Sequence, residues 1–226
     1  MFVSIPPRRR RQWRWVTPAL LLLLAAAFVW TLQLPPEQRQ ALLQARGMLG
    51  GGVPSRGGVA WQGLAIRVFS ASFLHADWSH LIGNLAFLMI FGLPAERMMG
   101  SLRFLALFLL GSAVANLAAA STIADGEVLI GASGGVSAVI GAWLALFPRA
   151  RLGVVVPLGL FLEFVRAPAA LLIGVWALLQ VLFAYIGPAY GQVAWIAHLA
   201  GFGFGGLFAV LSRAAIAKRL RRQRGY

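Results

Sequence analysis

The sequence predicts an all-α membrane protein, folded as a bundle of six transmembrane helices. Hydrophobic residues make up 60% of its 226 residues and charged residues only 12%, and the mean hydropathy is +0.79. A soluble domain of this length carries more polar residues than that. Apolar stretches long enough to cross the core of a bilayer recur six times along the chain. Both ends of the chain are rich in arginine, which gives the bundle an orientation.

The six predicted spans have short connections, apart from a long first loop. They cover residues 18–34, 78–94, 102–120, 133–147, 169–186 and 193–212. An even number of crossings brings both termini to the same side of the membrane. Basic residues gather in the terminal segments and in the second and fourth loops, whereas the charged residues of the third loop are Asp125 and Glu127. The positive-inside rule therefore predicts that both termini are cytoplasmic.

Three regions are expected along the chain. They are a basic, disordered cytoplasmic arm (residues 1–16), the membrane domain (17–212) and a basic cytoplasmic tail (213–226). Orientation and attraction to anionic lipids explain the net charge of +14, so we predict no nucleic-acid partner. The chain has no cysteine, which excludes disulfides, metal–thiolate sites and thiol nucleophiles. We expect neither a cofactor nor a bound metal.

The first loop, between Pro35 and Ser72, is too long to be a simple connector. It contains several glycines and an amphipathic set of residues that includes Trp61 and Phe69. Because part of its surface is apolar, we expect this loop to lie in the membrane interface against the bundle, as monotopic helices do.

Polar side chains inside predicted spans are costly in lipid and mark candidate functional sites. The second span holds His80 and Asn84, which share one helical face because they are four residues apart. Asn116 in the third span and Gln180 in the fifth are expected to form hydrogen bonds between helices. A hydrogen bond between helices is also the alternative to a functional role for His80 or for Asn84, when either residue is considered alone.

Small residues repeat at every fourth position in the fourth and sixth spans. The repeats are Ser133, Ser137, Gly141 and Ala145 in one span and Ala197, Gly201, Gly205 and Ala209 in the other. Membrane helices with such faces approach closely because no large side chain separates their backbones. We therefore predict that these two spans pack together, with His198 beside the start of the second repeat.

Four polar side chains converge at one depth in this arrangement. The second, fourth and sixth spans run in the same direction, and His80, Asn84, Ser133 and His198 lie within about two turns of their starts. Ser133, in Gly131-Ala132-Ser133-Gly134-Gly135, is the candidate nucleophile and His198 the candidate base of acyl transfer. His80 and Asn84, with backbone N–H groups at the start of the fourth span, are the candidate oxyanion donors.

The acidic residues all fall outside the predicted spans. They are Glu37, Asp77, Glu96, Asp125, Glu127 and Glu163. A carboxylate often orients the histidine of a serine hydrolase. Here we expect a Ser–His dyad instead, with the imidazole held by packing.

These residues resemble the motifs of the rhomboid intramembrane serine proteases. The resemblance extends from Arg67 to Gly205 and rests on Phe73-Leu74-His75, His80-x-x-x-Asn84, Gly131-Ala132-Ser133-Gly134, Ala197-His198-x-x-Gly201, Gly205, Glu96-Arg97, Gly100 and Arg103-Phe104-Leu105. It implies a bundle of rhomboid type and a serine endopeptidase, with Ser133 as nucleophile, His198 as base and an oxyanion hole that includes His80 and Asn84.

The resemblance also implies partners and a route by which they enter, whereas the six-helix core with its arginine-rich ends suggests the location. The substrates would be transmembrane proteins that enter near the second and fifth spans and are cut near the outer membrane face. Residues 187–191 would form a movable cap over the entry. We expect a multi-pass protein of a bacterial plasma membrane.

Two positions depart from the family pattern. Many rhomboid proteases carry an aromatic residue four positions after the serine, on which the histidine stacks, and this chain has Ser137 there. The tryptophan–arginine pair that is common in the first loop is Ile66-Arg67 in this chain.

Two other functional classes stay open. A non-catalytic rhomboid-like protein that binds membrane clients would share the fold, although such relatives usually lose the serine or the histidine. A transporter or channel would need polar residues through the full membrane depth. The inner halves of the fourth and sixth spans hold mainly Gly, Ala, Leu, Val and Phe.

Overall fold

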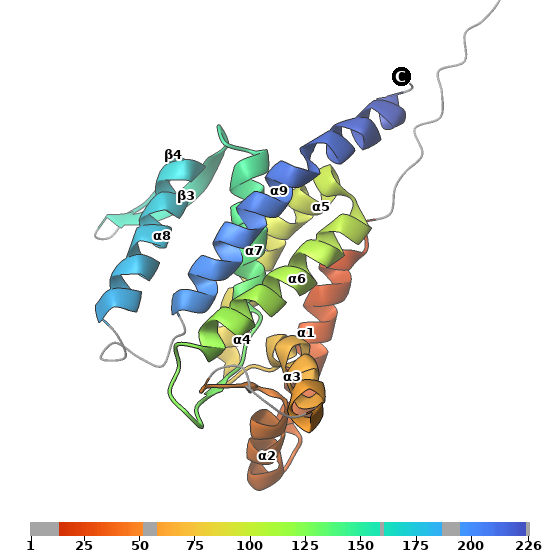
Figure 1. Ribbon diagram of the computed structural model, residues 1–226. Coiled ribbons are helices and arrows are strands. Elements are labelled where there is room, and N and C mark those ends of the chain that lie inside the picture. The colour runs from red at the N-terminus through yellow and green to blue at the C-terminus, as the bar shows by residue number, and fades with distance from the viewer. Residues whose placement is uncertain (1–13, 52–57, 159–160, 187–194, 225–226) are drawn as a thin grey trace, which may run out of the picture.

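A computed structural model describes residues 14–51, 58–158, 161–186 and 195–224. Most of these residues are helical, and the long helices pack side by side in a bundle (Figure 1). The helices are α1 (Val16–Leu32), α2 (Pro36–Arg46), α3 (Gly58–Ser70), α4 (Trp78–Phe87), α5 (Leu93–Met99), α6 (Ser101–Ala120), α7 (Ser133–Leu146), α8 (Ala169–Ile186) and α9 (Trp195–Arg224). The predicted arm up to residue 13 and the predicted cap at residues 187–191 lie outside the described part of the chain.

Within the described residues, four helical segments are long and apolar enough to cross a membrane. They are Trp78–Met99, Ser101–Ala120, Ala169–Ile186 and Trp195–Arg222. The apolar helices α1 and α7 are shorter, with 17 and 14 residues. In α7 every residue from Gly134 to Trp143 is buried, so neighbouring helices surround this helix. The architecture is that of a multi-pass helical membrane protein.

The second predicted span is one continuous helical segment whose hydrogen-bond pattern changes midway. Helix α4 runs into a π-helical turn, η2 (Leu88–Gly92), and then into α5, where Pro94 lies in the first turn. Proline has no backbone donor, and π turns accommodate such local breaks in the regular pattern. The segment ends at Met99, because Gly100 adopts a φ of +86° and donates its N–H to the carbonyl oxygen of Glu96.

The carboxylate of Glu96 joins α1 to the start of α6. It is buried and accepts hydrogen bonds from the backbone N–H groups of Val16 and Thr17, from the Thr17 hydroxyl at 2.7 Å and from the Ser101 hydroxyl at 2.5 Å. The backbone donors belong to the first turn of α1 and have no acceptor within their own helix. We predicted that Glu96 lies in a loop, but it lies in α5. Its carboxylate accepts the hydrogen bonds that join α1 to the start of α6.

The long first loop folds into α2, α3 and the short 3-10 helix η1 (Ala71–Phe73). Helices α2 and α3 lie at the end of the bundle opposite the C-terminal end of α9 (Figure 1). The side-chain amide of Asn116 in α6 donates to the carbonyl oxygen of Val68 and to the hydroxyl of Ser72. The interhelical hydrogen bond that we predicted for Asn116 is therefore confirmed.

Two further contacts close this end of the molecule. Arg67 of α3 donates to the carbonyl oxygens of Gln44 and Gly47 at the C-terminal end of α2. The short strand β1 (Met48–Leu49) pairs antiparallel with β2 (Val128–Leu129), which lies shortly before α7. The first loop is thus tied to the segment that leads to Ser133.

Helices α7 and α9 pack with their backbones in contact, as their small residues predicted. A Cβ added at Gly201 would collide with the carbonyl oxygen of Gly134, and one at Gly205 with that of Ala138. Gly201 and Gly205 of the repeat predicted on α9 are therefore confirmed as contact residues. On α7 the contact face includes Gly141 of the predicted repeat together with Gly134 and Ala138, whereas Ser133 and Ser137 of that repeat line a cavity instead.

The fourth loop contains a β-hairpin that we did not predict. Strands β3 (Arg151–Leu158) and β4 (Phe161–Pro168) pair antiparallel along their whole length. The run Val154-Val155-Val156 favours extended backbone because β-branched residues fit strands better than helices. Figure 1 shows the hairpin beside α8 at the edge of the bundle. The protein is therefore mostly helical rather than all-α.

Helix α9 continues to Arg224, so the predicted basic tail is helical as far as that residue. Residues 207–224 contain neither glycine nor proline and are rich in alanine, leucine and arginine, which favour helix. Arg219 donates to the carbonyl oxygens of Arg97 and Met98 near the end of α5. The boundary predicted at residue 212 marks the end of the apolar part of this helix, not the end of the helix.

Candidate active site

Three helices begin at one end of the bundle and contribute to the wall of an open cavity there. Helices α4, α7 and α9 run in the same direction, with their first turns toward the end where α2 and α3 lie (Figure 1). The cavity has a volume of about 470 Å³, and its wall includes Ser133, His198, His80 and Asn84. The structure thus brings the four candidate side chains to one place, while their chemical roles stay predictions.

Ser133 is the first residue of α7 and is half-buried. The N–H groups of a helix's first turn have no acceptor within the helix, and the helix dipole favours negative charge beside them. The hydroxyl of Ser137, one turn further on, donates to the carbonyl oxygen of Ser133 at 2.7 Å. The start of α7 therefore combines a hydroxyl with backbone donors at the wall of the cavity.

His80 lies against the backbone that leads into α7. Gly131 has a φ of +125°, and a Cβ at this position would lie 2.6 Å from Cε1 and Nε2 of the His80 ring. Glycine tolerates this conformation and leaves room for the ring. The backbone N–H of His80 donates to the Asp77 carboxylate, which caps α4, at 2.8 Å. The backbone of His80 is therefore held by Asp77, and its ring packs closely against Gly131.

Asn84 lies one turn after His80 and is buried, with 5% of its surface exposed. Its Nδ2 donates to the carbonyl oxygen of His80 at 2.9 Å. Because an amide nitrogen carries two hydrogens, a second donor is available to a ligand in the cavity.

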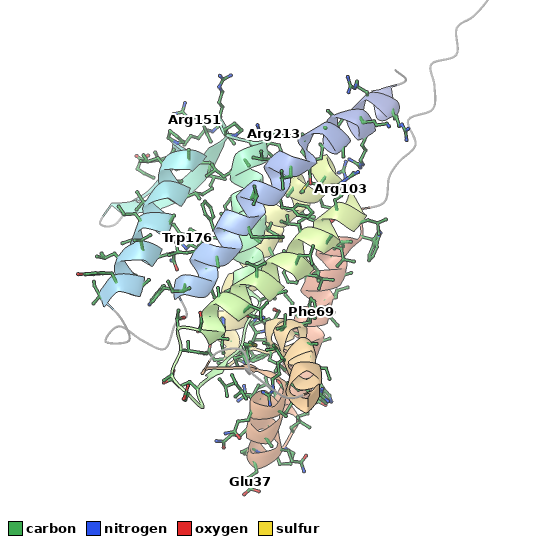
Figure 2. All side chains as sticks on the ribbon, in the orientation of Figure 1. Glu37, Phe69, Arg103, Arg151, Trp176 and Arg213 are labelled. Carbon is green, nitrogen blue, oxygen red and sulfur yellow. The ribbon has the colours of Figure 1, made fainter. Side chains whose placement is uncertain are left out.

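His198 lies in the first turn of α9 and is held by side chains of α8. Its Nδ1 lies 2.7 Å from Oε1 of Gln180. The ring of Trp176, one turn earlier in α8, lies 6.4 Å from the imidazole with 28° between the two planes. The ring of Trp195 meets the imidazole edge-on at 6.1 Å. Figure 2 shows Trp176 on the side of α8 that faces α9.

Our expectation that packing alone holds this imidazole is wrong, because an amide oxygen also contacts it. The interhelical hydrogen bond predicted for Gln180 is confirmed, but its partner could not be predicted. Residue spacing does not fix how far α8 is rotated about its own axis. The aromatic neighbour that many relatives carry at the position of Ser137 comes here from Trp176, on a different helix.

His75 packs beneath the site, against Ala132 and His80. It is fully buried, its Nε2 accepts the backbone N–H of Ala132 at 3.5 Å, and its ring meets the ring of His80 edge-on at 5.2 Å. Burial, followed by the nearby His80, lowers the pKa of His75 to about 4, against the opposing effect of Asp77. The ring is therefore neutral near pH 7 and acts as an acceptor just before Ser133. Its place in a family motif was the sequence signal for this residue.

Asp77 lies at the wall of the same cavity. Hydrogen bonds from the Ser79 hydroxyl and then from the backbone N–H of His80 lower the pKa of its carboxyl group. The carboxylate is thus used to cap α4 and to fix the backbone of His80.

The cavity offers a hydroxyl, an imidazole with one nitrogen not engaged by Gln180, and side-chain and backbone donors. These are the groups that nucleophilic attack on a carbonyl carbon requires. In the described part of the chain, no group of three or more His, Cys, Asp or Glu side chains could hold a metal ion.

Comparison with known proteins bears on this arrangement. A search of curated proteins gives no match. A family model described as the Rhomboid domain matches residues 62–215, a range that includes all four candidate residues. This range covers more than half of the chain and confirms the resemblance found in the motifs: the protein belongs to the rhomboid family of membrane proteins, whose members are generally intramembrane serine proteases.

Proposed function

We propose that this protein is an intramembrane serine endopeptidase that cleaves transmembrane proteins. One observation carries the proposal: Ser133 and His198, from two helices whose backbones touch, line the same cavity as His80 and Asn84. Membership of the rhomboid family supports this class of activity.

In the proposed reaction, Oγ of Ser133 attacks the carbonyl carbon of a peptide bond while its proton passes to Nε2 of His198. The C–N bond then breaks, and the same proton moves from Nε2 to the leaving amine. An acyl group remains on Ser133. A water molecule then attacks this ester and gives its proton to Nε2, and the proton returns to Oγ as the acid leaves.

Negative charge develops on the carbonyl oxygen in both steps. We assign its stabilisation to His80, Asn84 and the N–H groups in the first turn of α7. The close approach of His80 to Gly131 and the second amide hydrogen of Asn84 support these roles. Loss of one such donor is expected to slow the reaction by on the order of a hundredfold.

The proposal includes six spans, with both termini in the cytoplasm of a bacterial plasma membrane and the cavity toward the outer face. Helices α1 and α7 are the two spans proposed in addition to the four long apolar segments. Helix α1 is apolar. Helix α7 is short, but protein surrounds it, so it exposes little backbone to lipid. Arg103, Arg151 and Arg213 lie at one end of the molecule (Figure 2), which favours a cytoplasmic position for that end, although α2 at the other end carries Arg39 and Arg46 beside Glu37. Anionic headgroups of the inner leaflet are the proposed lipid partners of Arg103, Arg151 and Arg213.

The alternative is a rhomboid-like protein that binds membrane clients without cutting them. It predicts specific binding of transmembrane segments and no new termini. The presence of both a serine and a histidine at the cavity favours the enzyme.

The test uses the full chain in proteoliposomes with a labelled transmembrane substrate that has small residues near its outer end. We expect the native protein to cleave it, and Ser133→Ala and His198→Ala to be slower by about a thousandfold or more. Ser121→Ala, in an exposed position after α6, is the matched control and should cleave at the native rate.

Cleavage at the native rate by either of the two variants would contradict the mechanism. Specific substrate binding by the native chain without any cleavage would instead support the client-binding alternative.

A further inference from the structure

The imidazole of His198 lines the cavity, and one of its two nitrogens is engaged by a side chain of α8. Its Nδ1 contacts Oε1 of Gln180 at 2.7 Å, and Gln180 is buried, with 5% of its surface exposed. We propose that Gln180 is a positioning residue, whose side-chain oxygen keeps the proton of neutral His198 on Nδ1 and so leaves Nε2 free to accept the proton of Ser133.

A neutral imidazole carries its proton on only one of its two nitrogens. An acceptor beside Nδ1 selects the form with the proton on that atom, and the lone pair then lies on Nε2. In a serine protease triad, the wrong form of the histidine lowers kcat by about ten-thousandfold. The amide of Gln180 therefore performs the orienting part of the task that a carboxylate performs in such a triad.

An amide suits this place in the fold because α8 is otherwise apolar and many of its side chains are exposed on the outside of the bundle. Exposed examples are Leu171, Val175, Leu178 and Leu182. A charged carboxylate within a span is costly to bury, whereas a hydrogen-bonded amide supplies an acceptor without net charge. The chain thus obtains an oriented base with no acid on α8.

Trp176 adds a second contact from the same face of α8, because it precedes Gln180 by four residues. Its ring lies against the imidazole, and it also contacts Phe202 of α9 at 5.8 Å between ring centroids. Gln180 thus sets the direction of the Nδ1–H bond, and Trp176 restricts the plane of the ring. The orientation of the His198 ring therefore depends on the position of α8 relative to α9.

This inference rests on the proposed proteolytic function for the role of Nε2, but the hydrogen bond can be tested without a substrate. The chain contains three histidines, so nitrogen NMR of the full protein with ¹⁵N-labelled histidine resolves few signals. The variant His198→Gln assigns the signal of His198. We expect neutral His198 to carry its proton on Nδ1 in the native protein, and to lose this preference in Gln180→Met, which keeps the length of the side chain but removes the acceptor.

Kinetics supply the second readout. We expect Gln180→Met to lower kcat by about tenfold or more with KM changed by less than about twofold, because the base is misaligned while the substrate contacts are kept. Gln180→Glu retains an acceptor oxygen and should keep the proton of neutral His198 on Nδ1. Leu179→Met, on the exposed side of α8, is the matched control and should behave as the native protein does.

A native His198 that carries its proton on Nε2 would overturn the proposal, and so would a Gln180→Met protein with native kcat and an unchanged histidine signal. If the native chain cleaves no substrate but the histidine signal responds to Gln180→Met as expected, the proteolytic function fails and the positioning contact stands. If the chain cleaves and the signal does not respond, the positioning role alone fails. The signal of the native protein tests the contact even where a variant does not fold.

Discussion

His75 contributes a neutral ring to a buried place beside the backbone that leads to Ser133, where a charged ring would lose its hydration. Its lowered pKa and its contact with the N–H of Ala132 both depend on that burial. Acid is therefore expected to lower the stability of the protein through this one side chain.

The folded protein should lose stability as the pH falls from about 6.5 toward 4. The pKa of His75 is about 4 in the folded protein, against 6.5 for an unperturbed histidine, so the unfolded chain binds the proton more readily across this window. The neutral ring of His75 contributes at most about 3 kcal/mol to the free energy of unfolding, and this contribution is complete above pH 6.5. Thermal unfolding in detergent at several pH values should show a weaker pH dependence for His75→Gln than for the native chain; equal pH dependence would contradict the assignment.

Gly131 provides a second prediction that concerns a single residue. Gly131→Ala places a methyl group 2.6 Å from the His80 ring at a φ of +125°, so we expect the ring to be displaced and kcat/KM to fall by about tenfold or more. The control is Gly126→Ala, at a φ of +81° with no atom within 4 Å of the new methyl group, which bears only the backbone cost. Equal activity of the two variants would show that the contact with His80 does not matter.

Helices α7 and α9 carry the proposed nucleophile and base, so their close approach sets the geometry of the cavity. Gly201 and Gly205 allow this approach, because each lies against a carbonyl oxygen of α7. For this pair of helices, the important quantity is the distance between the two backbones rather than any single hydrogen bond.

We expect Gly205→Ala to destabilise the protein by about 1–3 kcal/mol, because the added methyl group overlaps the backbone of Ala138. Gly203→Ala, two residues earlier in the same helix, meets no atom within 4 Å and should be neutral or stabilising by up to about 1 kcal/mol. Thermal unfolding in detergent compares the two variants. A Gly205→Ala protein as stable as Gly203→Ala would contradict the packing of α7 on α9.

Across the whole molecule, residue spacing and helix direction were enough to predict which side chains meet. Ser133, His198, His80 and Asn84 each lie near the start of a helix that runs in the same direction, so their depth could be derived from the sequence. The partner of Gln180 could not be derived, because it depends on the rotation of α8 rather than on depth.

The face that α7 presents to α9 was predicted only in part, for a similar reason: Gly141 belongs to the predicted repeat, whereas Gly134 and Ala138 do not. Small residues occur on two adjacent faces of α7, and only the packed structure shows that Gly134, Ala138 and Gly141 contact α9 while Ser133 and Ser137 face the cavity. The hairpin of β3 and β4 was missed because a short apolar run between two spans does not by itself distinguish a strand from a loop.

We propose that the fold activates the hydroxyl of Ser133 through His198. Intact mass spectrometry of the full protein, treated with a fluorophosphonate that traps activated serines, tests this claim without knowledge of the natural substrate. We predict a single adduct on Ser133 in the native chain, no adduct in Ser133→Ala and labelling slowed by about a hundredfold or more in His198→Ala. A native chain that stays unlabelled, or that is labelled equally fast when His198 is replaced by alanine, would contradict the account.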